Sequence, residues 1–335
     1  MFHRCDAVLL FLIGSAAAAA PPTQQRTRCQ AAAAPTQRTR RQALRYGVGG
    51  AATWPLATAA LPSDNAGALT TLRRRVGQKT LAQGSYGLDA PDVYYPDFFE
   101  GTWRVTSKAV EVSAPCGAPL FGGNASLAAA RAELEAAPVV YEARWIRDGR
   151  GRLIADRPYN IGSIAAATMG GADALQQLPS SDAFDPNGLI FKLRPEGSDV
   201  TYRAELRALA RRFEPSAGEL RDSSGLLVFD AGELSRQSIS LPGKELVQPP
   251  SVKDIETINL FTLMKNGRIT STQRTSTWLV GTEGIAALKA QAADGRAVDV
   301  RTYKVDYERL KYSMLYYSGL GRFADGSSEK SSGVP

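Results

Sequence analysis

Four polar side chains, expected inside or at the mouth of a predicted barrel, are candidates for binding a ligand: Arg157, Asn160, Arg236 and Arg274. A buried arginine requires either a carboxylate partner or an anionic ligand. The alternative to a ligand site is a structural network in which these arginines pair with acids such as Asp156 or Glu256. An arginine that points into a cavity without a nearby acid would favour a ligand, whereas full pairing would favour the network.

Three of the four histidine and cysteine residues of the chain lie in the first 59 residues: His3, Cys5 and Cys29. If this leader is removed, the remaining chain has no histidine and a single cysteine, Cys116. That composition excludes Ser-His-Asp and Cys-His catalysis, histidine-ligated metals, and cysteine-ligated zinc or iron–sulfur sites within one chain. We therefore predict a non-catalytic protein with no metal and no cofactor, while carboxylate, lysine or tyrosine chemistry stays open.

Three acids, Asp92, Asp97 and Glu100, cluster among aromatic residues before the first predicted strand. Carboxylates in such a group could hold calcium or act in acid/base catalysis. A solvated acidic loop at the mouth of the sheet is the alternative that we favour, because acidic residues are mostly exposed.

The leader is rich in arginine and poor in acids. Residues 1–59 contain seven arginines and one acid, Asp6; subtraction from the chain totals of 40 and 33 leaves 33 basic and 32 acidic residues in 60–335. The pattern predicts a signal peptide over about 1–20, a transit peptide over about 21–38 and a twin-arginine signal over about 39–59. With a net charge of only +1, the mature chain gives no reason to expect a nucleic-acid partner.

Paired arginines, Arg40 and Arg41, precede the weakly apolar end of the leader. An A-x-A sequence places the expected cleavage between Ala59 and Ala60. The three signals in this order resemble the presequence of a thylakoid-lumen protein from an alga with a secondary plastid, which would use the twin-arginine translocase. The alternative is simple secretion, and a glycan on Asn124 would favour it.

The mature chain is patterned for β-structure. After an irregular or helical lead-in over 60–90, residues 91–312 show alternating apolar and polar positions in about eight to ten short runs, and 313–335 form a flexible tail. We predict a mainly β domain: one antiparallel meander closed into a barrel, with helical insertions at 125–137 and 285–293. An open sandwich is the alternative. Closure is favoured because it removes unpaired strand edges.

The clearest predicted hairpin joins 255–264 to 268–280 through Asn266 and Gly267. This dipeptide favours a type I′ turn, in which both central residues have positive φ. The first strand is expected over 102–112, with a phase slip near Val110.

Gly101 and Trp103 at the start of the first strand resemble the Gly-x-Trp signature of lipocalin-like (calycin) barrels. The resemblance implies that Trp103 closes one end of the barrel and could contact a ligand. Over about 90–312 the chain also resembles an uncharacterised family of cyanobacteria and plastids, known as a domain of unknown function and expected in the thylakoid lumen. The segments that carry this similarity are 94–96, 101–103, 155–160, 233–237, 256–257 and 273–275.

Two functions fit these observations. The first is a lumenal protein that binds a small apolar or amphipathic molecule in the barrel. The second is an assembly or interaction factor for a photosynthetic membrane complex, with a filled barrel; an enzyme that uses carboxylates is a third, less favoured. An apolar cavity of ~300 Å³ or more would favour the ligand. No run of ~18 apolar residues predicts a transmembrane span.

Overall fold

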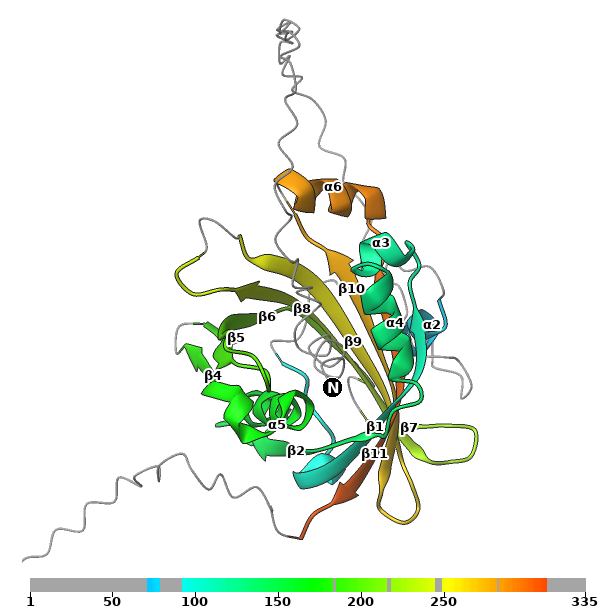
Figure 1. The fold of residues 1–335 in the computed structure, drawn as a ribbon. Helices are drawn as coiled ribbons and strands as arrows, with labels where there is room; N and C mark the ends of the chain where they lie inside the picture. The colour runs from blue at the N-terminus through cyan, green and yellow to red at the C-terminus, as the bar shows by residue number, and fades with distance from the viewer. Residues whose placement is uncertain are drawn as a thin grey trace, which may run out of the picture. The chain divides into compact units, whose positions relative to one another are not determined.

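The computed structural model describes residues 71–78, 92–182, 185–215, 218–244, 249–281 and 283–311. The described strands form one antiparallel, eleven-stranded sheet that curls into a half-barrel (Figure 1). Along the sheet the strand order is β3-β2-β1-β11-β10-β9-β8-β6-β5-β4, and β7 pairs with β8. The strands are β1 (Gly101–Ser113), β2 (Val139–Arg147), β3 (Leu153–Ala155), β4 (Leu175–Asp182), β5 (Asp185–Leu193), β6 (Tyr202–Glu214), β7 (Leu220–Arg221), β8 (Leu227–Ser240), β9 (Ser251–Leu263), β10 (Ile269–Leu279) and β11 (Asp299–Arg309).

The described helices are short and lie between strands or before the sheet. They are α2 (Thr71–Val76), α3 (Ala118–Phe121), α4 (Asn124–Ala132), α5 (Arg157–Met169) and α6 (Gly284–Ala293), with 3-10 turns η1 (Asp97–Phe99) and η2 (Ala172–Ala174). The predicted insertions at 125–137 and 285–293 correspond to α4 and α6. The leader, most of the lead-in and the predicted tail lie outside the described residues.

The predicted closure of the barrel is wrong. Among the described residues no strand pairing joins the two ends of the sheet, β3 and β4. Helix α5 lies between these ends and packs against both β2 and β4 (Figure 1). Helix α5 therefore covers the opening that pairing between β3 and β4 would close. It also covers the exposed edge of the sheet, an arrangement that the alternation of apolar and polar residues does not predict.

Two side chains of α5 hydrogen-bond to the free edge of β2. Asn160 accepts from the Arg144 backbone N–H through Oδ1 (2.7 Å) and donates through Nδ2 to the Arg144 carbonyl (3.1 Å). Ser163 Oγ accepts from the Glu142 N–H (2.9 Å). The opposite side of the helix is apolar: Ala165 and Met169 belong to a core cluster with residues of β5, β6 and β8.

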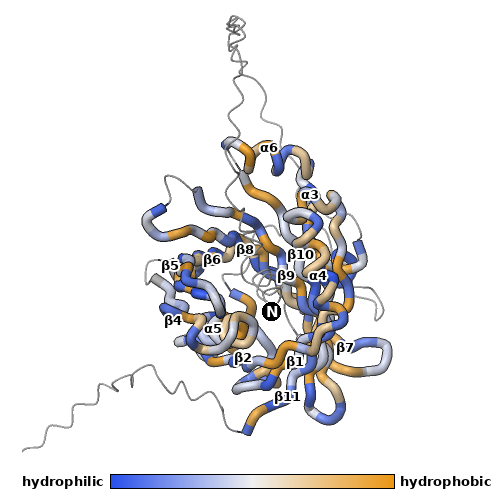
Figure 2. Tube along the Cα trace, in the orientation of Figure 1, coloured by the Kyte–Doolittle hydropathy of each residue, from blue (hydrophilic) through white to orange (hydrophobic). Residues whose placement is uncertain are grey.

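The main core lies on the inner face of the sheet. Alternation along each strand sends every second side chain inward, and apolar and polar residues accordingly follow one another along the strands (Figure 2). Aromatic rings meet near one end: Phe99 contacts Trp145, Phe229 and Phe261 with centroid distances of 5.1, 5.9 and 4.9 Å. Such rings bury large areas and favour edge-to-face contact.

The hairpin at Asn266–Gly267 exists, but its turn is not type I′. Only Gly267 has positive φ (+79°), and its N–H donates to the Met264 carbonyl (2.9 Å). Met264 N–H in turn donates to the Arg268 carbonyl (2.8 Å), so the loop has three residues and Gly267 serves as the bulge. The same pattern joins β2 to β3 at 148–152 and β7 to β8 at 222–226.

Several predicted segments differ from the structure in extent. The phase slip near Val110 is confirmed as a register shift between Ala109 and Glu111. The predicted helix 125–137 begins at Asn124, directly after its cap residue Gly123, and ends at Ala132. Helix α5 begins at Arg157, directly after the Asp156 cap, whose side chain accepts from the Tyr159 N–H.

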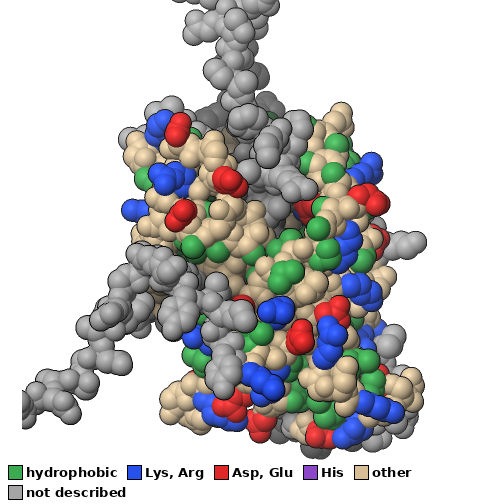
Figure 3. All heavy atoms as spheres, turned by 60° about the horizontal axis from the view of Figure 1, so that its bottom comes forward, with side chains coloured by type: hydrophobic (Ala, Val, Ile, Leu, Met, Phe, Trp, Pro, Cys, Tyr) green, Lys and Arg blue, Asp and Glu red, His purple; other side chains and the backbone are tan. Residues whose placement is uncertain are grey.

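The surface carries both charge signs. On the face seen in Figure 3, lysine and arginine side chains alternate with aspartate and glutamate, and no large area of one sign stands out.

Candidate functional site

Arg157 lies inside the curled sheet, at the start of α5, and is fully paired. Its guanidinium donates to both oxygens of Asp92 (2.9 and 2.7 Å) and to Glu233 (3.0 Å). Burial by itself lowers the pKa of Arg157, but the charges of Glu233 and Asp92 outweigh it, so the pKa is raised. The pairing removes the reason to expect an anionic ligand at this residue.

Arg211 extends the same network and was not singled out from the sequence. Its Nε donates to Glu233 (2.8 Å) and its Nη1 to Asn187 (2.8 Å). Arg211 and Glu233 stand directly opposite one another on β6 and β8. Because cross-strand neighbours depend on register, the sequence alone could not have placed them together.

The other predicted residues lie apart. Arg236 pairs with Asp254 (2.8 and 3.0 Å), and Arg274 donates to Glu256 (3.4 Å); both pairs are on the outer face of the sheet. Asn160 holds the edge of β2, as described above. The structure thus does not bring the predicted set into one site.

Trp103 is buried in the main core at the start of β1. Its Nε1 donates to the Phe99 carbonyl (2.7 Å), and the Arg309 guanidinium lies 4.9 Å from the centre of its ring. The indole is therefore held by a hydrogen bond, a cation–π contact and core packing.

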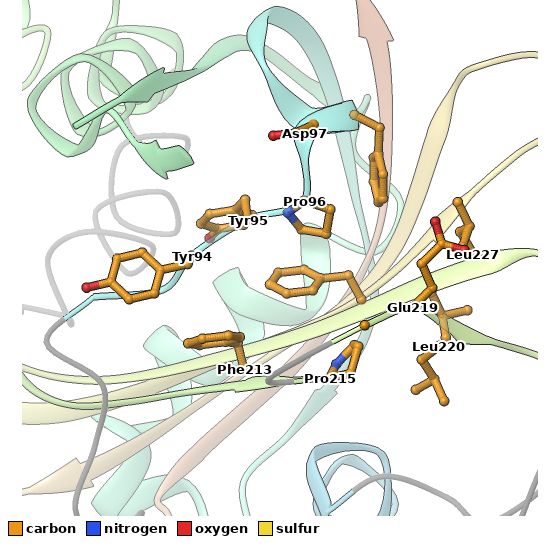
Figure 4. A pocket seen from close by; sticks show the side chains of 13 residues that line it. Tyr94, Tyr95, Pro96, Asp97, Phe213, Pro215, Glu219, Leu220 and Leu227 are labelled. Atoms are coloured by element: carbon orange, nitrogen blue, oxygen red, sulfur yellow. The ribbon is translucent and has the colours of Figure 1, made fainter. Parts of the chain in front are cut away.

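A pocket of about 410 Å³ opens at the aromatic end of the sheet. Its walls come from the segment before β1, the end of β6, residues Pro215 and Gly218, and β7 with the start of β8 (Figure 4). The lining residues are Tyr94, Tyr95, Pro96, Asp97, Phe98, Phe213, Pro215, Gly218, Glu219, Leu220, Leu227, Val228 and Phe229.

The pocket is predominantly apolar. Tyr94 and Phe213 meet edge to face (5.9 Å between centroids), and Tyr95 packs against Phe229 (5.3 Å). Two exposed carboxylates, Asp97 and Glu219, supply its charge, and none of the thirteen described lining residues is basic. Burial raises the pKa of Tyr95 above its ordinary value, so the site does not supply a phenolate. This arrangement suits an apolar or amphipathic molecule better than a reaction.

The three acids noted before the first strand divide between two arginines. Asp92 pairs with Arg157, whereas Asp97 and Glu100 both pair with Arg147 (3.1 and 2.8 Å). No group of three or more acidic, histidine or cysteine side chains in the described part of the chain could hold a metal ion.

A second inward cluster lies near α4. Arg301 donates to Asp299 (3.0 Å) and to Glu133 (2.9 Å), and burial raises the pKa of Glu133. Lys253 lies close by on β9, where burial and the charge of Arg301 lower its pKa to about 8.

Within the described residues, no helix is long and apolar enough to cross a membrane.

Comparison with known proteins identifies the family but no activity. No curated protein and no solved structure matches the chain. A family model described as Domain of unknown function (DUF6816) matches residues 87–311, about two thirds of the chain, and the chain therefore belongs to that family.

Proposed function

We propose that the protein is a non-catalytic binding protein of the plastid thylakoid lumen, whose ligand is a small apolar or amphipathic molecule such as a pigment, lipid or quinone derivative. The observation that carries the proposal is the pocket of about 410 Å³ at the aromatic end of the sheet. Its volume lies within the range of small-molecule sites, and its walls are mostly aromatic and aliphatic. The ligand site is thus at one end of the sheet rather than at Arg157, Arg236 or Arg274.

The lumenal part of the proposal rests on the leader. The order of the three signals in residues 1–59, and the paired Arg40 and Arg41, support import into the plastid and passage through the twin-arginine translocase.

Native mass spectrometry of residues 60–335, purified from the plastid, tests the binding function. We expect a co-purifying small molecule in the wild-type protein and its loss in Leu220→Trp, because the larger side chain fills the pocket. Leu209→Trp is the matched control, since Leu209 is exposed on β6 and does not line the pocket. Folding of each variant is checked by circular dichroism. Equal ligand content in the two variants would contradict the proposal.

One observation favours the second candidate, an interaction factor for a photosynthetic membrane complex. Helix α6 presents Ile285 and Leu288, one turn apart, with 72% and 65% of their surface exposed. Exposed apolar residues on one helix face are typical of protein contacts. If this function holds, Ile285→Glu with Leu288→Glu abolishes co-purification with the complex, whereas Val200→Glu with Leu209→Glu, changed at two other exposed apolar positions, does not.

A further inference from the structure

Helix α2 docks on the outer face of the sheet through two arginines. Arg73 donates to Asp230 through Nε and Nη2 (2.8 Å each), a two-pronged geometry that is specific for guanidinium and carboxylate. Arg75 Nε donates to Glu256 (2.6 Å). Asp230 and Glu256 are 0% and 1% exposed, so both carboxylates are covered where α2 lies.

The contact also involves the backbone of α2 and an apolar side chain. Arg274 Nη1 donates to the Arg75 carbonyl (2.5 Å), and Glu214 accepts from the Leu72 N–H (3.4 Å). Leu72 itself is 0% exposed. The sheet thus offers carboxylates to two arginines, a donor to a carbonyl, and a place for one leucine, which together are the elements of peptide recognition.

The sheet residues that contact α2 belong to the family domain, whereas α2 does not. Asp230, Glu256 and Arg274 lie within 87–311, on β8, β9 and β10, and strand pairing fixes their positions. Helix α2 precedes that range and has only six residues, too few for a stable isolated helix. The site is therefore built by the sheet, and the sheet orders the helix.

We propose that the outer face of β8, β9 and β10 is a docking site for a peptide segment of the pattern Leu-Arg-x-Arg, which α2 occupies within its own chain and which the same segment of another molecule can occupy instead. Exchange is feasible because an ion pair that is buried on docking gains little over its hydrated state, whereas a buried carboxylate that has lost its arginine is strongly disfavoured. When α2 detaches, Asp230 and Glu256 on the sheet become hydrated, and they can then pair with the two arginines of another segment.

The test uses residues 60–335 with Arg73→Gln and Arg75→Gln, and a fluorescent peptide of residues 67–80 added in trans. We expect fluorescence anisotropy to show binding to this chain at least tenfold tighter than to the wild-type chain, where α2 competes. A peptide with Arg73→Gln and Arg75→Gln should lose this binding. A peptide with Arg74→Gln is the matched control and should keep it, because Arg74 is exposed and contacts only Thr71 within α2 in the described structure.

Equal affinity of the peptide for the two chains, or an equal loss with the Arg74→Gln peptide, would overturn the proposal. If the doubly substituted chain is unfolded by circular dichroism, the chain with Arg73→Lys and Arg75→Lys replaces it, since lysine keeps the charge but lacks the fork. The wild-type peptide should then raise the melting temperature of that chain, and the peptide without Arg73 and Arg75 should not. Absence of a shift with the wild-type peptide would also overturn the proposal.

Discussion

Glu233 joins two inward-facing arginines, because the same carboxylate oxygen accepts from Arg157 and from Arg211. This sharing links α5 to β6 and β8, and Asp92 adds the segment that precedes β1. The network therefore ties together parts of the chain that are far apart in sequence.

Replacing Arg157 with Met is expected to lower the free energy of unfolding by about 2–3 kcal/mol, because Asp92 and Glu233 lose their shared partner inside the sheet. The value is below that of a fully buried pair, since Asp92 and Glu233 keep 20% and 32% of their side-chain exposure. Arg221→Met removes an exposed pair with Glu219 and should cost less than ~1 kcal/mol. Urea unfolding measures both, and similar losses would contradict the structural role of Arg157.

Lys253 predicts a pH dependence of stability. Its pKa is lowered from 10.5 to about 8 in the folded protein, mainly by burial. Below about pH 8 the amine is charged in both the folded and unfolded chains, so the free-energy cost of burying its charge does not change with pH. Between pH 8 and 10.5 the unfolded chain holds a proton that the folded chain has released, so this residue makes stability rise with pH.

We therefore expect Lys253→Met to stabilise the protein at pH 7, and the difference from wild type to shrink by pH 9.5. Urea unfolding at the two pH values measures it. The difference isolates Lys253, because groups common to both proteins cancel. A difference that stays constant would show that the amine is not held in this environment.

At the scale of elements, α5 provides hydrogen-bond partners to the edge of β2 that a neighbouring strand would otherwise provide. Asn160 supplies a donor and an acceptor to the backbone of Arg144, which is the pattern that a neighbouring strand provides. This hydrogen bonding explains why α5 can lie between β2 and β4 although no continuous ladder of strand hydrogen bonds joins these two strands.

Asn160→Ala is expected to lower the free energy of unfolding by about 1–3 kcal/mol, because the Arg144 N–H at the edge of β2 loses its partner, while the Arg144 carbonyl keeps the Asp156 N–H (2.9 Å). Hydrogen exchange should accelerate at the Arg144 amide. Thr168→Ala serves as the control, because the Thr168 hydroxyl bonds only within α5 in the described structure, to the carbonyls of Ile164 and Ala165. Unchanged protection of Arg144 in the Asn160 variant would contradict the edge function.

Alternation predicted the long strands well and their connections less well. The predicted pair 255–264 and 268–280 corresponds to β9 and β10, and the alternating residues 139–147 form β2. Residues 226–229 and 233–241 read as two separate runs in the sequence, yet they form one strand, β8, because pairing with β9 continues without a break from Val228 to Ile239. Strand β4 was missed, since its sequence LQQLPSSD shows no clear alternation.

At the scale of the whole molecule, the predicted import route can be tested through the leader. With Arg40→Lys and Arg41→Lys the precursor should reach the stroma but remain uncleaved there, because the translocase requires the arginine pair. Import into isolated plastids, followed by fractionation and immunoblotting, measures this. Arg26→Lys with Arg28→Lys preserves charge in the transit region and should not block the lumen step. Normal lumenal accumulation of the first variant would contradict the route.

The location of the pocket could not be predicted from the sequence. Its walls combine residues 94–98 with residues near 213–229, and only the three-dimensional pairing of these segments creates the hollow. Of the charged candidates expected inside or at the mouth of the barrel, Arg157 lies inside the curled sheet, whereas Arg274 lies on its outer face. The acids that pair with them, Asp92 and Glu233 for Arg157 and Glu256 for Arg274, come from segments that only the folded sheet brings together. The residue types therefore indicated that these arginines need acidic partners, and the fold determines which acids pair with them.

The pairing of β1 with β11 has a consequence for biosynthesis. Trp103, near the start of the domain, stands opposite Arg309, near its end. The edges of β1 and β10 therefore stay unpaired on the ribosome until residues 299–309 have emerged. The nascent chain must carry the edge of β1 for nearly the whole synthesis of the domain and the edge of β10 only from residue 279 onward, and it can complete its sheet only after β11 has emerged.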